Sequence, residues 1–72
     1  MFKIQVCDDP TSLVPSSRHV DKDGSVTSEE VFYNDMLDAY EAGSKFCLNN
    51  MPFVKIAISR QCKDGWEVCG YM

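Results

Sequence analysis

The sequence lacks the long apolar run that a membrane span requires. None of its 72 residues belongs to a stretch approaching the roughly 18 apolar residues of a transmembrane helix. The amino-terminal segment MFKIQVCDD carries one lysine and no small-residue cleavage site, which is not typical of a secretory signal peptide. We therefore expect no membrane partner and a cytoplasmic location, in a bacterium or in the cytoplasm of a host cell if a phage encodes the chain.

Motifs of catalysis and phosphate binding are also missing. No Gly-rich phosphate loop, H-E-x-x-H or G-x-S-x-G motif occurs, and His19 is the only histidine. A Cys–His nucleophile would need one of the cysteines to be brought to this histidine by the fold. A chain of this length also has little room for a deep substrate pocket. We expect no catalytic residues and no cofactor, so the protein is predicted not to be an enzyme.

The four cysteines contain no C-x-x-C pair, and their spacing matches no common zinc module. They are Cys7, Cys47, Cys62 and Cys69. An even number of cysteines indicates disulfides mainly in secreted proteins, and cysteine is often buried as a small apolar side chain. We interpret the four as buried or half-buried structural thiols, with a disulfide or a metal site as the alternatives.

The composition, 44% hydrophobic and 25% charged, is typical of one compact domain spanning residues 1–72. A chain this short buries roughly 60% of its unfolded surface, so its stability margin is expected to be thin. Dimerisation, or docking on a partner, would relieve that shortage, and a homodimer is compatible with the sequence.

Alternating apolar and polar residues predict strands at both ends of the chain. Residues 2–7 alternate with a period of two, and residues 54–61 do the same. The K-D-G at 63–65 predicts a hairpin turn leading into a last strand over 66–72. A short edge strand is expected at 18–20, after a proline-rich loop.

The strongest helix signal follows residue 27. Thr27 and Glu30 have the spacing of a capping box. Apolar residues then recur every three or four positions, at Phe32, Tyr33, Met36, Leu37 and Tyr40. Gly43 is a natural stop. The pattern predicts a helix over Ser28–Ala42.

These elements predict an α+β fold, a single small domain in which a three- to four-stranded, mainly antiparallel sheet packs on one helix in the order β-(β)-α-β-β. The expected core comprises the inward positions of the strands and the apolar stripe of the helix. These residues are Phe2, Ile4, Val6, Phe32, Met36, Leu37, Tyr40, Val54, Ile56, Ile58 and Val68.

Residues 19–30 resemble an EF-hand calcium loop. The matching positions are Asp21, Asp23, Gly24 and Glu30. Two departures weigh against calcium: the first ligand position holds His19, and the preceding segment is rich in helix breakers. We interpret D-K-D-G as a polar turn and T-S-E-E as a helix cap. A degenerate calcium site remains the alternative.

Negative charge is concentrated in the middle of the chain. Residues 21–41 contain one lysine, Lys22, and seven acids, which are Asp21, Asp23, Glu29, Glu30, Asp35, Asp38 and Glu41. A protein that binds nucleic acid directly usually shows the opposite sign. Acids on a helix exterior are commonly just solvated, yet this predicted helix has no basic residue with which they could pair.

We therefore predict a small acidic protein-binding module whose acidic helix face docks on the basic surface of a host protein that handles nucleic acid. Such modules include inhibitors and modulators encoded by phages and mobile elements. Trp66 and Tyr71 are the expected aromatic anchors, with Phe53 and Met72 nearby. The alternatives are a metal-binding domain and a small structural or self-assembling component.

Overall fold

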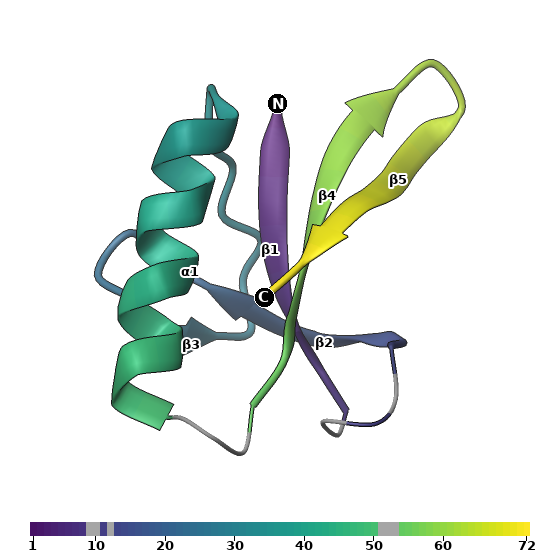
Figure 1. Ribbon diagram of the computed structural model, residues 1–72. Coiled ribbons are helices and arrows are strands. Elements are labelled where there is room, and N and C mark those ends of the chain that lie inside the picture. Colours follow the sequence, from purple (N-terminus) through teal and green to yellow (C-terminus); the bar gives the residue numbers. More distant parts are fainter. Residues whose placement is uncertain (9–10, 12, 51–53) are drawn as a thin grey trace.

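The computed structural model describes residues 1–8, 11, 13–50 and 54–72 of a single small α+β domain, in which one helix covers one face of a sheet (Figure 1). The elements follow in the order β-β-β-α-β-β. Their bounds are β1 Phe2–Cys7, β2 Pro15–Val20, β3 Val26–Thr27, α1 Met36–Asn50, β4 Ile56–Cys62 and β5 Gly65–Tyr71.

The sheet has five strands in the order β3-β2-β1-β4-β5, and every neighbouring pair is antiparallel. An antiparallel sheet packed on one helix is thus confirmed, whereas the predicted three or four strands are too few. The segment interpreted as a loop before residue 18 already belongs to β2, which begins at Pro15. Proline is tolerated there because the first residue of a strand can lack an amide donor.

The predicted hairpin between the last two strands is confirmed. Gly65 follows the turn as the first residue of β5 and has a φ of 125°, a conformation that glycine adopts without a steric penalty. From this turn β5 pairs back along β4, with Gln61 opposite Trp66 and Ala57 opposite Tyr71. In Figure 1 the hairpin points away from the helix.

The helix begins at Met36, and the predicted start at Ser28 is wrong. The Asp35 carboxylate accepts the Asp38 amide at 2.9 Å and therefore caps the helix. The Thr27 hydroxyl instead accepts the Glu29 amide at 3.2 Å, within the connecting segment. Tyr33 lies outside the helix because its backbone pairs with that of Phe2 through two hydrogen bonds of 2.8 Å.

The predicted helix end before Gly43 is also wrong, because the helix continues to Asn50. Gly43 lies in the helix where α1 presses most closely on the sheet. A Cβ atom at this position would lie 2.6 Å from Ile56 Cδ1 and 3.0 Å from Met72 Sδ. The glycine therefore permits close packing of helix on sheet and does not terminate the helix.

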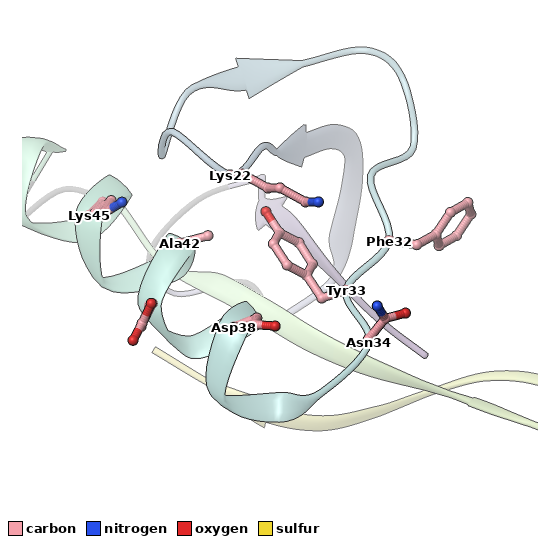
Figure 2. A pocket seen from close by; sticks show the side chains of 8 residues that line it. Lys22, Phe32, Tyr33, Asn34, Asp38, Ala42 and Lys45 are labelled. Atoms are coloured by element: carbon pink, nitrogen blue, oxygen red, sulfur yellow. The ribbon is translucent and has the colours of Figure 1, made fainter.

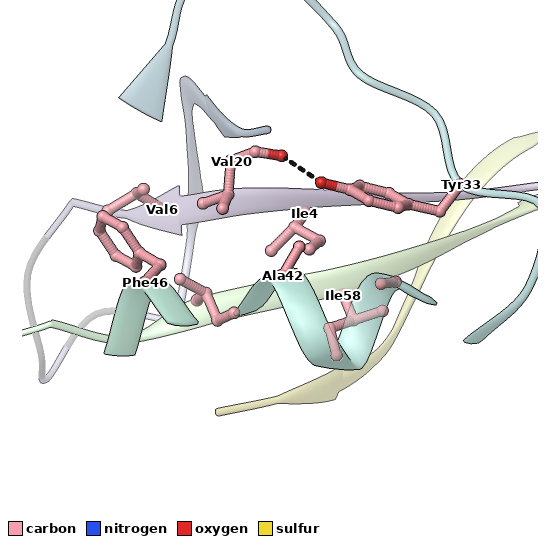
Figure 3. Packing of buried hydrophobic residues seen from close by; sticks show 9 residues of the cluster. Ile4, Val6, Val20, Tyr33, Ala42, Phe46 and Ile58 are labelled. Atoms are coloured by element: carbon pink, nitrogen blue, oxygen red, sulfur yellow. Dashed lines mark hydrogen bonds between the residues drawn. The ribbon is translucent and has the colours of Figure 1, made fainter. Parts of the chain in front are cut away.

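The core lies between α1 and the sheet (Figure 3). The predictions for Ile4, Val6, Ile56 and Ile58 are confirmed, since all four are buried. Phe2 and Val54 pack at its edge, and Val68 is half-buried. The remaining core residues, which the pattern missed, are Val20, Tyr33, Ala39, Ala42 and Phe46.

Four predicted core residues are exposed instead: Phe32, Met36, Leu37 and Tyr40. The cause is the shifted helix. The buried face of α1 is made of small residues and one phenylalanine, at Ala39, Ala42, Gly43 and Phe46. Large side chains on the other faces of α1 therefore point away from the sheet.

Candidate protein-binding surface

The seven acids of residues 21–41 lie on the β2–β3 turn, on the segment before α1 and on the first turns of α1. We call these seven residues the acidic surface. Three of them, Asp21, Glu30 and Asp35, have local structural roles.

Asp21 builds the turn between β2 and β3. Its Oδ1 accepts the amides of Asp23 and Ser25, both at 2.9 Å, so the predicted polar turn is confirmed. Gly24 has a φ of 79° and packs against α1, where a Cβ atom would lie 2.8 Å from Lys45 Cβ. The turn is therefore fixed against the helix.

Asp35 and Glu30 are also occupied. Asp35 caps α1, as described above, and its backbone oxygen accepts the Ala39 amide at 3.3 Å. Glu30 pairs with the Lys3 ammonium at 3.3 Å. The Lys3 side chain is only 12% exposed, whereas Glu30 is 51% exposed, so the pair is shielded from solvent on the lysine side only.

Trp66, predicted to be a partner anchor, is half-buried in a cluster on the sheet. The Lys3 ammonium lies 4.5 Å from the centre of its ring, and the ring stacks on that of Phe32 at 5.7 Å. Lys3 alternates with Ile4, whose side chain enters the core, so this cluster lies on the face away from α1. Trp66 holds the segment before α1 against the sheet.

Tyr71, the other predicted anchor, is 42% exposed, and its hydroxyl donates to the Leu13 carbonyl at 3.2 Å. It ties β5 to the β1–β2 connection. Phe53 lies outside the described residues, and Met72 packs at the edge of the core. The structure thus does not bring the predicted aromatic anchors together with the acids of α1.

Four acids have no ion pair or side-chain hydrogen bond within the described structure: Asp23, Glu29, Asp38 and Glu41. Asp38 and Glu41 line a groove of about 260 Å³ between α1 and the segments that precede it (Figure 2). The complete lining is Lys22, Phe32, Tyr33, Asn34, Asp38, Glu41, Ala42 and Lys45.

The groove is lined by equal numbers of acidic and basic side chains and by the rings of Phe32 and Tyr33. Two carboxylates and two lysines, Lys22 and Lys45, line it, and no ion pair joins them in the part of the chain that the structure describes. Figure 2 shows Asp38 and Lys45 on the helix, with Lys22 and Tyr33 opposite them. The Tyr33 hydroxyl donates to the Val20 carbonyl at 2.9 Å, and burial raises its pKa to about 12. Four unpaired charged groups can therefore reorganise around a charged partner group at small cost.

The sequence patterns also missed an apolar surface, the outward face of α1. Leu37 is 69% exposed, Tyr40 52% and Leu48 77%. Leu37 and Tyr40 were assigned to the core, and Leu48 lies beyond the predicted end of the helix at Ala42. The small residues Ala39, Ala42 and Gly43 carry the signal that could have located the buried side, since their spacing places them on one face.

Several residues of the segment that resembles a calcium loop are buried or have other partners. His19 is buried in β2, Asp21 already accepts two backbone amides, and Glu30 pairs with Lys3. Among the described residues, no group of three His, Cys, Asp or Glu side chains could hold a metal ion. No single feature of this region therefore favours calcium over the turn.

The thiols are distributed over the fold. Cys7 is buried, and Cys47 and Cys62 are half-buried, as predicted, whereas Cys69 is exposed on β5. Burial raises the pKa of the Cys47 thiol, which keeps it in the less reactive protonated form.

Comparisons with protein-family models, with curated proteins and with solved structures give no match for this chain. Within the described residues, no helix has the length and apolar character needed to cross a membrane.

Proposed function

We propose that this protein is a binding module whose acidic surface docks on a basic surface of another protein. The partner is of the kind that handles nucleic acid, since such proteins present basic surfaces to phosphates. The module acts as an inhibitor or modulator, by occupying that surface in the cytoplasm, and performs no chemistry of its own.

The observation that carries the proposal is the set of unpaired carboxylates at Asp23, Glu29, Asp38 and Glu41. Unpaired surface charges of one sign raise the rate of encounter with an oppositely charged partner and disfavour wrong partners. Three further acids are held in place by the turn, the helix cap and the Lys3 pair. The charge is thus presented on fixed backbone, which lowers the entropy lost on binding.

The groove adds specificity to this charge. A lysine or arginine side chain of the partner that enters the groove can pair with the carboxylates of α1 that line it. Lys22 and Lys45 disfavour the binding of a second cationic side chain of the partner in the groove. They favour an acidic side chain of the partner beside the bound cation. The partner surface is therefore expected to be basic with isolated acids, and not uniformly basic.

The test is capture of the partner by tagged protein from a nuclease-treated lysate of the native host. The informative variant is D23N/E29Q/D38N, which removes three charges of the acidic surface and keeps Glu41. The matched control, D8N/D64N/E67Q, removes three acids from outside residues 21–41.

We expect one stoichiometric partner that is lost at high salt, lost with the first variant and retained with the control. Circular dichroism verifies that both variants are folded. Capture that survives the D23N/E29Q/D38N change at physiological salt would show that the acidic surface does not bind the partner. Equal loss in both variants would indicate a net-charge effect without a specific surface.

A further inference from the structure

The outward face of α1 is apolar, and no other element of the described chain covers it. Figure 1 shows α1 at one edge of the molecule, with the sheet on its other side. Leu37 and Leu48 are the most exposed large hydrophobic side chains in the described structure. Exposed apolar surface of this kind commonly marks an interaction site, and a small domain gains stability by covering it.

Helix geometry places these side chains on one line. Leu37 and Leu48 are 11 residues apart, which is about three turns, so they point in nearly the same direction. Ser44 lies between them along the same line, and its small side chain permits a close approach of another helix. Tyr40 and Cys47 flank the line on one side, and Glu41 and Lys45 flank it on the other.

We propose that a second copy of this chain covers this face, with the two α1 helices antiparallel about a two-fold axis. Leu37 and Leu48 lie at equal distances from the midpoint between Ala42 and Gly43. A two-fold axis at that level places Leu37 of each copy against Leu48 of the other. The contact is self-complementary, as a closed dimer requires.

Charge complementarity selects this arrangement. In the antiparallel register, Glu41 of one copy and Lys45 of the other lie on the same flank of the helix pair. Their levels along the helix axis differ by about 1.5 Å. Both Glu41–Lys45 pairs form by symmetry. Parallel helices related by a two-fold axis would instead set the Glu41–Lys45 flank of each copy against the Tyr40–Cys47 flank of the other, so these two ion pairs could not form.

The opposite flank is apolar in this register. Tyr40 of one copy lies near Cys47 of the other, and both side chains are at least partly exposed in the single chain. The interface therefore has leucines in the centre, aromatic and thiol contacts on one side, and ion pairs on the other. The inference goes beyond the proposed function, since it assigns α1's outward face, with Glu41 and Lys45 of the groove, to self-association and leaves the other six acids of the acidic surface free.

Sedimentation equilibrium on the purified chain tests the proposal. We expect a dimer that dissociates on dilution, and L37E/L48E is expected to raise its dissociation constant by about 100-fold or more. Both leucines are exposed, so this variant should remain folded by circular dichroism. The matched control V14E/V26E adds the same two charges at exposed valines and should leave the dimer intact.

The register has its own test. E41K and K45E should each weaken the dimer, and the double swap E41K/K45E should restore it, because each pair is re-formed with reversed charges. A chain that stays monomeric at millimolar concentration, a dimer insensitive to L37E/L48E, or a double swap that does not restore binding would each overturn the proposal. A monomer whose L37E/L48E variant no longer captures the lysate partner would assign this face to that partner instead.

Discussion

Substitution of Gly43 by alanine tests the packing of α1 directly. The new methyl group would lie 2.6 Å from Ile56 Cδ1. Overpacking of this kind costs about 1–3 kcal/mol, while alanine gains about 1 kcal/mol of helix propensity over glycine. We therefore expect G43A alone to lower the free energy of unfolding by about 1 kcal/mol. I56V removes the Cδ1 atom and alone costs about 1 kcal/mol.

In the I56V background the sign should reverse, because the methyl group then occupies vacated space and the helix propensity remains. G43A is expected to stabilise I56V by about 1 kcal/mol, giving a coupling of about 2 kcal/mol between the two sites. Urea denaturation followed by circular dichroism resolves this, since 1 kcal/mol moves the midpoint by about 1 M. G43A that destabilises both backgrounds equally would refute the close packing of Gly43 on Ile56.

Three further outcomes are expected. D35A should lower the free energy of unfolding by about 1 kcal/mol and speed amide exchange in the first turn of α1. D35N should leave that turn protected, because asparagine caps a helix as well as aspartate does. T27A should also leave it protected, because Thr27 does not cap α1. Burial raises the pKa of Tyr33 from 10.0 to about 12, so the folded state holds the proton more tightly and stability should fall as pH rises from 10 to about 12. Tyr33→Phe should abolish this fall in alkaline denaturation curves and cost about 1 kcal/mol at neutral pH. Low-millimolar calcium should leave the amide shifts of residues 19–30 unchanged in NMR spectra, and saturable shifts there would revive the calcium site.

Several elements were predictable because their signals are local. The alternation in β1 and β4 and the Asp64–Gly65 turn depend on neighbouring residues alone, and they predicted those strands within two residues. The Asp21 turn was found for the same reason. Charge counting likewise located the acidic surface, since it depends only on composition along the chain.

The predicted helix starts too early because local sequence signals and a long-range contact favour different structures for residues 28–35. Thr27 and Glu30 have capping-box spacing, and Phe32 and Tyr33 continue an apolar pattern. A backbone pairing between Tyr33 and Phe2 prevailed, and it joins residues that are 31 positions apart. No local pattern reports such a contact. Periodicity that emphasises large apolar residues also overlooked the small residues of the buried helix face.

The acidic residues likewise show what the sequence alone determines and what only the tertiary structure decides. Sequence alone determined that residues 21–41 are acidic, that the chain forms an α+β domain and that strands lie close to residues 2–7, 54–61 and 66–72. Tertiary structure decided that Asp35 caps α1, that Glu30 meets Lys3 and that Leu37 and Leu48 face outward. The physical reason is that propensity and charge act between near neighbours, whereas burial depends on which distant segments occupy the other side of each residue.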